Sequence, residues 1–191
     1  MRKNKILQES LALFANKGYF ETSMEDIAKA VGIKKASLYS HFSGKEDIFS
    51  AVFNHILIDY STFINELTTF KENVDVQEKL NIIFTRYIKN CRNNAQMDFW
   101  DRYFYYPPEY LKEYIHEKTD ETEKELTKKV AAIIEEGIEK KQFKNKDASE
   151  VALAYYYMMI GFAMSIKFYD ERDIERDLSS CFNAFLDGIK I

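Results

Sequence analysis

Apolar residues recur at helical spacing throughout the chain, and small or polar residues mark where each run stops. In the first run Leu7, Leu11 and Phe14 stand at positions i, i+4 and i+7, the spacing of one face of an amphipathic helix. Gly18 follows this run, and glycine is the residue that most often stands just beyond a helix end. The pattern therefore predicts a first helix that ends before Gly18.

Two shorter runs follow the first helix. Ser23 and Gly32 bound the second run, whose apolar positions share one helical face: Met24, Ile27, Ala28 and Val31. Ser23 and Asp26 have the spacing of a capping box, in which two side chains bond each other's backbone. Leu38 and Phe42 then predict a third helix of about two turns. Helix, glycine stop and short helix is the pattern of a helix-turn-helix, whose second helix enters the DNA major groove.

A long fourth helix is predicted after Ser43 and Glu46, which repeat the capping pattern. Its apolar positions cover more than one face: Ile48, Phe49, Val52, Phe53, Ile56, Leu57, Tyr60, Phe63, Ile64 and Leu67. A helix of this kind is covered on two sides, so we expect it to join two subdomains. Further helices are predicted at about 75–92, 95–106, 109–141, 147–168 and 172–189. The predicted fold is all-α, with an N-terminal three-helix unit joined by the long helix to a larger helical body.

The composition agrees with a helical, folded protein. Only six Gly and two Pro occur in 191 residues, which is sparse for a protein rich in β-turns. A hydrophobic content of 46% and an aromatic content of 15% exclude a disordered chain. The two cysteines, Cys91 and Cys181, lie far apart and indicate no disulfide framework.

Two features of the chain bear on its location. Polar residues at positions 8–10 interrupt any apolar core of a signal peptide. Residues 151–166 carry no charge, but a membrane span needs about 20 apolar residues, so a buried helix is the better interpretation. We expect a cytoplasmic protein without a membrane segment.

Charge is distributed unevenly along the chain. Residues 1–45 contain eight Lys or Arg and four Asp or Glu, a net charge of +4, whereas the whole chain carries -4. A basic end on an acidic body suggests that this end meets a polyanion. The alternative is a chance excess of surface lysines.

The third predicted helix presents a small, polar outer face. At about 100° per residue, Leu38 and Phe42 point into the core, and Ala36 and Ser40 point the opposite way. The flanking positions are Ser37 and Tyr39. Small side chains let a helix backbone approach base edges closely, and serine can bond to any base.

Positive and hydroxyl-bearing residues surround this helix. Lys34 and Lys35 stand at its start, where the helix dipole and two ammonium groups suit phosphates. Half or more of protein–DNA hydrogen bonds are of this kind, which positions the protein on the duplex and does not read its sequence. The other candidate phosphate contacts are Thr22, Ser23, His41 and Lys45. The sequence therefore predicts duplex DNA as the partner of this end of the chain.

Residues 22–49, "TSMEDIAKAVGIKKASLYSHFSGKEDIF", closely resemble the signature of TetR-family transcriptional regulators. The shared features are the Thr-Ser opening, Ile27-Ala28, the 30–33 stretch Ala-Val-Gly-Ile, the Leu-Tyr-x-His-Phe of 38–42 and Lys45-Glu46. The first helix, "ALFANKGYFETS" at 12–23, fits as well. The match covers about the first 50 residues; beyond them only the helical architecture and the length resemble the family.

The resemblance implies a homodimeric repressor released from a palindromic operator by a small, partly apolar effector. It implies a DNA-binding domain at 1–46 and an effector-binding and dimerisation domain at 47–191. By position, Tyr39 and His41 resemble the family's phosphate clamps, and residues 35–37 approach bases. Lys34 departs from the serine that often caps this helix in the family; the lysine removes the serine hydroxyl from the cap position and adds a phosphate contact.

The dimer contact is expected in the distal body. Two recognition helices that reach successive major grooves need about 34–36 Å between them. The uncharged helix and the last helix are the candidates for this contact because a sixteen-residue uncharged stretch needs a cover. The predicted interface residues are Tyr155, Met158, Phe162, Leu178, Phe182 and Phe185.

An aromatic cluster before Pro107 is the candidate effector pocket, since pockets are mostly apolar with a few placed polar groups. The candidate lining residues are Phe99, Trp100, Arg102, Tyr103, Tyr106, Tyr156 and Met159. Ordinary core packing is the alternative for each of these side chains.

Two other functions compete with this interpretation. An enzyme is disfavoured because the histidines at 41, 55 and 116 lack metal-binding spacing, and no phosphate loop or nucleophile elbow occurs. No metal and no cofactor are expected. A DNA-binding regulator without an effector, whose body serves protein contacts, stays open as the alternative.

Overall fold

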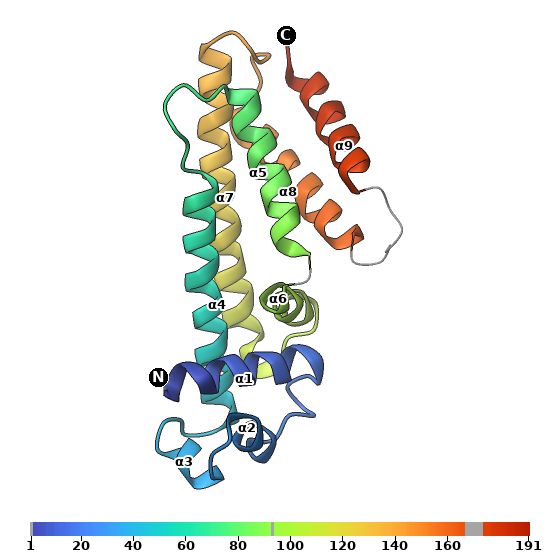
Figure 1. The fold of residues 1–191 in the computed structure, drawn as a ribbon. Coiled ribbons are helices and arrows are strands. Elements are labelled where there is room, and N and C mark those ends of the chain that lie inside the picture. The colour runs from blue at the N-terminus through green and yellow to red at the C-terminus, as the bar shows by residue number, and fades with distance from the viewer. Residues whose placement is uncertain (1, 93, 167–173) are drawn as a thin grey trace. The chain divides into compact units, whose positions relative to one another are not determined.

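The computed structural model describes residues 2–92, 94–166 and 174–191. The described chain is helical, as Figure 1 shows. Its elements are α1 (Arg2–Asn16), α2 (Met24–Val31), α3 (Lys35–Tyr39), α4 (Lys45–Leu67), α5 (Val76–Cys91), α6 (Ala95–Tyr105), the 3-10 helix η1 (Glu109–Leu111), α7 (Lys112–Glu139), α8 (Ala148–Ser165) and α9 (Ile174–Ile189). The all-α prediction is confirmed. The predicted stretches 167–168 and 172–173 lie outside the described residues.

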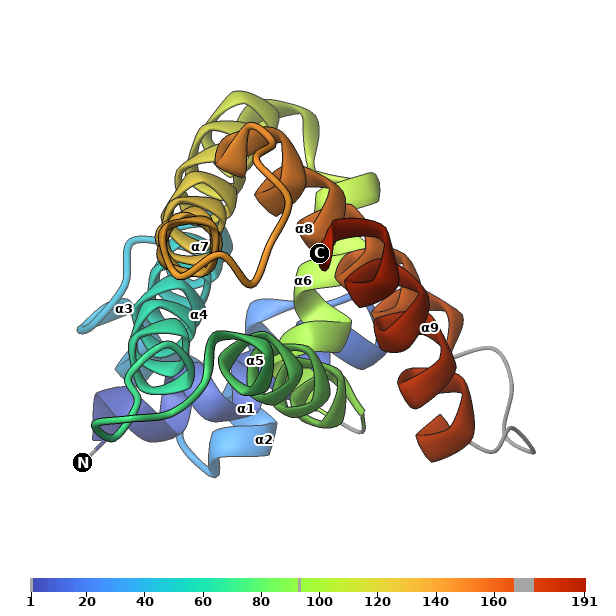
Figure 2. The same cartoon turned by 90° about the horizontal axis from the view of Figure 1, so that it is seen from above.

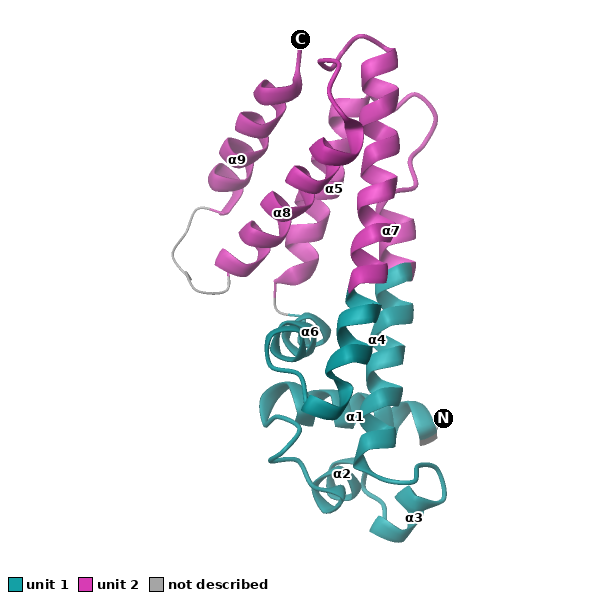
Figure 3. Cartoon of the chain, turned by 180° about the vertical axis from the view of Figure 1, so that it is seen from behind, with its two compact units in different colours: residues 1–61, 94–119 teal, residues 62–93, 120–191 magenta. Residues whose placement is uncertain are grey.

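The chain forms two compact units, coloured separately in Figure 3. Unit 1 comprises residues 1–61 and 94–119, and unit 2 comprises residues 62–93 and 120–191. Helices α4 and α7 each contribute to both units. The unit boundary therefore falls within α4, whereas the functional boundary predicted at 46/47 falls near its start. The compact unit extends beyond residue 46 because α6 packs against α1 and is therefore grouped with the N-terminal helices.

Aromatic residues fill the core of unit 1. The ring of Phe49 on α4 lies 5.3 Å from Phe14 on α1 and 4.7 Å from Tyr103 on α6. The buried residues around them come from every helix of the unit and include Ile6, Ile27, Leu38, Phe53 and Phe99. One core therefore joins the three N-terminal helices to α4 and α6.

The caps at the start of the chain are partly those predicted. Ser23 and Asp26 form the predicted capping box at α2, and Gly32 ends this helix in the left-handed conformation at φ 78°. At α4 the prediction of Ser43 with Glu46 is wrong. Asp47 instead accepts from the Ser43 backbone N–H at 2.8 Å and from its hydroxyl at 3.2 Å, one position further along the helix.

In unit 2, helix α5 packs against α8 and α9 (Figure 2). The Phe84 ring of α5 lies 5.8 Å from Phe162 on α8 and 6.0 Å from Phe182 on α9. Tyr155 of α8 is fully buried, and its hydroxyl donates to the carbonyl of Leu80 at 2.6 Å. Along the described chain, no helix combines the length and apolar character that crossing a membrane demands.

Candidate nucleic-acid interface

Helix α3 is held in place by Leu38 and turns its other side chains outward. Leu38 is fully buried in the core of unit 1, and Phe42 just beyond the helix is buried there as well. Tyr39 keeps 53% of its surface exposed. The predicted site residues Lys34, Lys35, Ala36, Ser40 and His41 are exposed, and Ser37 is half-buried. The inward and outward faces of α3 thus agree with the helical-wheel prediction.

The start of α3 lacks a side-chain cap. Lys34 occupies the N-cap position in extended conformation, and its side chain makes no capping hydrogen bond. Helix α3 spans five residues, shorter than the two turns predicted. Its first N–H groups stand beside two exposed lysines, an arrangement that suits a phosphate oxygen. The departure of Lys34 from the resembling family's serine thus leaves these N–H donors without a side-chain partner.

The hydroxyl groups near α3 already have partners inside the chain. Ser40 donates its hydroxyl to the carbonyl of Ser37 at 2.8 Å. Ser23 is exposed, but its hydroxyl and its backbone N–H both donate to the carboxylate of Asp26, at 2.7 and 2.9 Å. Lys17 also donates to this carboxylate at 2.9 Å. These bonds hold the pKa of Asp26 far below its usual value of 3.8, with the Ser23 hydroxyl as the largest cause.

Two side chains that were predicted to contact phosphates are instead bonded to backbone carbonyls of the chain. Thr22 is 1% exposed, and its hydroxyl donates to the carbonyl of Gly18 at 2.7 Å. The prediction that this hydroxyl reaches a phosphate is corrected, because the bond ties it to the turn that follows α1. Lys45 is half-buried; its ammonium donates to the carbonyl of Tyr19 at 2.8 Å and lies 4.3 Å above the Tyr19 ring. Its burial lowers the Lys45 pKa.

The structure adds Lys3 to the candidate interface. Its ammonium lies 5.5 Å above the ring of Phe42, the residue after His41, and its side chain is exposed. Lys3 therefore extends the positive surface of α3 onto the start of α1. The charge excess of residues 1–45 includes this lysine, but helical periodicity could not place it beside α3.

The seven candidate pocket residues are divided between the units. Phe99, Trp100, Arg102, Tyr103 and Tyr106 belong to unit 1, and Tyr156 and Met159 belong to unit 2. The prediction that Phe99 and Tyr103 line a pocket is corrected to core packing. Their rings lie 4.5 Å apart within the unit 1 core, and the Tyr103 hydroxyl donates to the carbonyl of Phe14 at 3.0 Å.

The remaining candidates differ in exposure. Tyr106 is 82% exposed, and Tyr156 is half-buried. Met159 is fully buried in unit 2. Arg102 is exposed and donates to the carbonyl of Ala15 at 2.8 Å.

Trp100 is the pocket candidate with the most distinctive surroundings. It is half-buried, and its ring is stacked at 5.6 Å on Phe53 and at 5.9 Å on Tyr60, both from α4. One turn before it on α6, Gln96 donates its amide to the carboxylate of Asp59 at 2.7 Å. Gln96 and Asp59 were not among the predicted residues, since two polar residues on separate helices carry no signal in the sequence.

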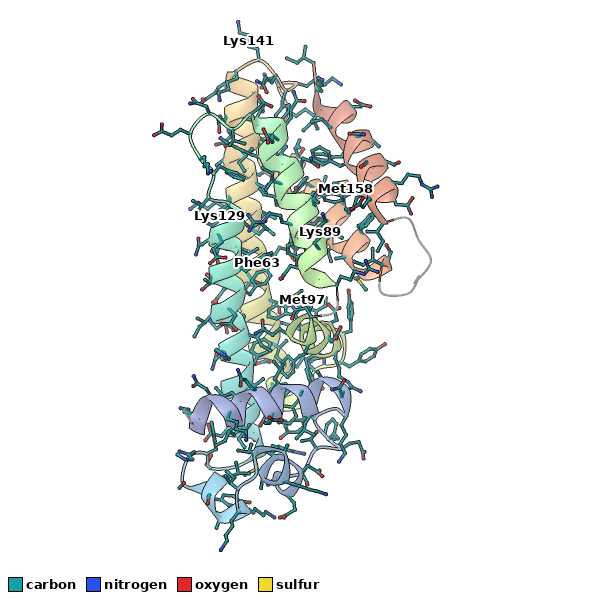
Figure 4. The ribbon with its side chains drawn as sticks, in the orientation of Figure 1. Phe63, Lys89, Met97, Lys129, Lys141 and Met158 are labelled. Atoms are coloured by element: carbon teal, nitrogen blue, oxygen red, sulfur yellow. The ribbon has the colours of Figure 1, made fainter. Side chains whose placement is uncertain are left out.

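The predicted dimer residues are also divided by the structure. Tyr155, Leu178 and Phe182 are buried. Tyr155 and Phe182 pack on α5 of the same chain. The interface prediction is corrected for these three. Met158, labelled on α8 in Figure 4, is half-buried, as are Phe162 and Phe185. Among the described residues, no group of three or more His, Cys, Asp or Glu is placed to hold a metal ion.

Comparison with known proteins supports the N-terminal geometry. Residues 6–52 match the sequence profile described as "Bacterial regulatory proteins, tetR family". Over 82 residues the chain is 38% identical to the biofilm operon icaADBC HTH-type negative transcriptional regulator IcaR of Staphylococcus aureus (strain Newman). This alignment covers 43% of the chain and 44% of that relative, so the chain spans less than half the length of the curated relative that it matches.

Solved structures match the chain over nearly its whole length. A TetR transcription regulator from Haloarcula marismortui ATCC 43049 superimposes with a TM-score of 0.77 at 17% identity, covering 100% of this chain and 98% of that chain. The fatty acid degradation regulator FadR from Bacillus halodurans gives a TM-score of 0.72 at 20% identity, covering 97% and 94%. At these identities the likeness extends to the fold alone.

Proposed function

Since residues 6–52 place the chain in the tetR family of bacterial regulatory proteins, we propose that it is a homodimeric transcriptional repressor. It binds a palindromic DNA operator and leaves that operator when a small, partly apolar effector binds the body. The orientation of the side chains of α3 is the observation that supports this proposal. Leu38 anchors the helix in the core, and the lysines at its start and Tyr39 and His41 at its end face outward.

Each part of the α3 surface has a task in DNA binding. Ala36 is exposed and small, so the helix backbone can approach base edges in the major groove. Lys34 and Lys35 meet phosphates at the start of the helix, and Tyr39 and His41 meet them at its end. Lys3 adds a further positive charge. Functionally, residues 1–46 form the DNA-binding domain and residues 47–191 the effector-binding and dimerisation domain.

The homodimer is proposed to form through the outer faces of α8 and α9. Helix α8 carries no charge after Glu150, and a helix that is apolar all round is normally covered on all sides. Its inner face packs on α5, where the Phe162 ring lies 5.8 Å from Phe84, which leaves half-buried Met158 and the uncovered part of Phe162 for a partner. Phe185 on α9 completes the proposed contact.

Effector coupling is proposed to pass from α6 to the end of α1. Within unit 1, Arg102 and Tyr103 of α6 donate to the carbonyls of Ala15 and Phe14 in the last turn of α1. The residues that follow this turn lead directly to α2. An effector beside Trp100 that moves α6 changes the position of the helix-turn-helix, provided it binds the two arrangements with unequal affinity.

The DNA-binding proposal is tested by selection from a pool of random duplex DNA, followed by sequencing of the retained fragments. We expect the wild-type protein to enrich a palindrome and the Tyr39→Ala variant to lose this enrichment. Tyr106→Ala is the matched control, because Tyr106 is a more exposed tyrosine of the same unit at the end of α6. Equal enrichment by the wild-type and Tyr39→Ala proteins would contradict the role of α3.

The effector proposal can be tested with the fluorescence of Trp100, the single tryptophan of the chain. Small apolar molecules are screened for those that change this fluorescence, and the operator affinity is then measured at saturating ligand. We expect a ligand that changes the fluorescence to weaken operator binding. Unchanged operator affinity at saturation would instead support a DNA-binding regulator without effector control.

A further inference from the structure

A shallow groove runs between α7 and α8 in unit 2. Its volume is about 560 Å³, and its walls include Lys124, Lys128, Ala131, Ala132, Glu135 and Leu153. The first turns of α8 lie beside α7, as Figure 2 shows. None of these residues belongs to the α8–α9 contact or to the DNA surface proposed above.

The floor of the groove is apolar and accessible. Leu153 exposes 41% of its surface. Tyr157, one turn further along α8 and outside the groove, is 58% exposed and donates its hydroxyl to the Glu123 carboxylate of α7 at 3.3 Å. Ala132 on α7 is exposed, and Ala131 beside it is buried. The small exposed side chain of Ala132 allows a second helix to approach α7 closely, because the separation of packed helix axes depends on the side chains at the contact. The groove therefore offers a partner an apolar floor between α7 and α8, bordered by charged side chains.

Charges of opposite sign lie on either side of the alanine pair. Lys128 precedes Ala131 by three residues, and Glu135 follows Ala132 by three residues. Both are exposed, and neither takes part in an ion pair with another residue of the described ranges. Charged groups of this kind are free to pair with a partner.

A second lysine and a second glutamate lie about one turn further from the alanines on either side. Lys124 precedes Ala131 by seven residues, and Glu139 follows Ala132 by seven. Lys124 pairs with Asp120 of its own helix at 2.5 Å, but it remains largely exposed, and so does Glu139. At these four positions of the helix, lysines therefore precede the alanines and glutamates follow them.

This order of charges is complementary to itself when reversed. We propose that the groove holds α7 of a second copy of this chain, packed antiparallel about a two-fold axis at the Ala131–Ala132 pair. Lys128 then faces Glu135 of the partner subunit, and Lys124 faces Glu139 of the partner subunit. Each pair occurs twice, because both subunits offer the same surface to a two-fold axis.

This contact is separate from the proposed α8–α9 dimer and does not depend on DNA binding. A chain with two different two-fold contacts can assemble beyond a dimer, and two axes that cross at right angles close an assembly of four chains. If the α8–α9 contact does not form, the α7 contact alone gives a dimer. The two proposals can therefore fail independently.

The test uses charge reversal and complementation, followed by sedimentation velocity over a micromolar concentration series without DNA. We expect the wild-type protein to associate from two chains to four, and Lys128→Glu or Glu135→Lys to weaken this step about tenfold. An equimolar mixture of the two variants restores the association, because the carboxylate introduced at position 128 of one variant faces the ammonium introduced at position 135 of the other. Raised salt weakens the wild-type association in the same way as either single substitution.

Lys112→Glu is the control. Lys112 is an exposed lysine at the first position of α7, away from the groove, and its substitution changes the charge by the same amount as Lys128→Glu. It should associate like the wild type. Because Lys128 and Glu135 are exposed, both variants should keep the wild-type melting temperature. Wild-type association in each single variant, or no recovery on mixing them, overturns the proposal. The wild-type protein could instead pass from monomer to dimer while Lys128→Glu stays a monomer. That result supports the α7 contact and contradicts the α8–α9 dimer.

Discussion

Single side chains determine how much of the surface near α3 is free for DNA. Ser23, Ser40 and Thr22 already use their hydroxyls in bonds within the chain. Tyr39 and the exposed lysines are left to make the outward contacts. The sequence predicted the outward direction of these residues from helical spacing. It could not predict that Thr22 is buried, because that depends on the carbonyl of Gly18 in a turn.

Gly137 on α7 is a position where one added carbon has no room. A Cβ there would lie 2.2 Å from the Phe143 ring, which is 2% exposed and cannot move into solvent. We expect Gly137→Ala to lower the free energy of unfolding by about 1–3 kcal/mol, measured by urea denaturation. Gly188→Ala is the control, because it meets no atom within 4 Å and should be neutral or stabilising. Equal stability of the wild type and Gly137→Ala would contradict the close packing of Phe143.

Asp26 links stability to pH. Its pKa is lowered in the folded chain from the usual 3.8, so its charged form stabilises the fold above that value. This contribution is lost as the pH falls through the lowered pKa of the folded state. We expect Asp26→Ala to be less stable than the wild type at neutral pH, with a difference that shrinks in acid.

The control for this pH dependence is Glu25→Ala, at the neighbouring carboxylate. Urea denaturation at neutral and acidic pH gives the comparison. A difference between Asp26→Ala and the wild type that is the same at both pH values would show that the capping box does not depend on the charge of Asp26.

At the scale of helices, the contact of α6 with the last turn of α1 connects the aromatic body to the helix-turn-helix. Arg102 and Tyr103 donate to successive backbone carbonyls, and a Cβ on Gly18 would lie 3.3 Å from the Arg102 guanidinium carbon. Gly18 has a φ of 92°, which favours glycine. The corner after α1 is therefore shaped both by its own backbone and by α6.

Tyr103→Phe removes one of these bonds while keeping the ring. We expect a loss of about 1 kcal/mol in the free energy of unfolding, because the Phe14 carbonyl still accepts from the Gly18 N–H at 3.1 Å. Tyr106→Phe, at an exposed tyrosine of the same unit, should change nothing. Burial raises the pKa of Tyr103 to about 12, so its contribution fades as the pH rises from 10 toward that value. A Tyr103→Phe protein as stable as the wild type would contradict this bond.

Helical periodicity predicted the existence and order of the helices because each apolar face repeats within its own segment. It could not assign Phe99 and Tyr103 to the core rather than a pocket. That distinction depends on Phe14 and Phe49, which lie far away in the sequence. For the same reason, Tyr155 was expected to face a partner chain and instead donates to Leu80.

For the whole molecule, the distribution of charge favours binding of DNA by one end. Residues 1–45 carry a net +4 and the rest of the chain carries -8. DNA affinity should therefore fall steeply with salt, because each phosphate contact releases a counterion. Lys35→Ala removes one contact per subunit and should reduce the slope of log K against log salt by about 2 in a dimer. Lys112→Ala serves as the control, and an unchanged slope for Lys35→Ala would remove Lys35 from the phosphate contacts.

Hydroxyl-radical footprinting on the selected duplex tests the central claim most directly, because it shows where two copies of α3 meet DNA. We expect two protected segments related by the dyad of the palindrome, with centres about 34–36 Å apart on one face of the duplex. The Tyr39→Ala protein should lose both segments, and Tyr106→Ala should keep them. A single protected segment, or protection that survives Tyr39→Ala, would contradict a dimeric repressor that reads its operator through α3.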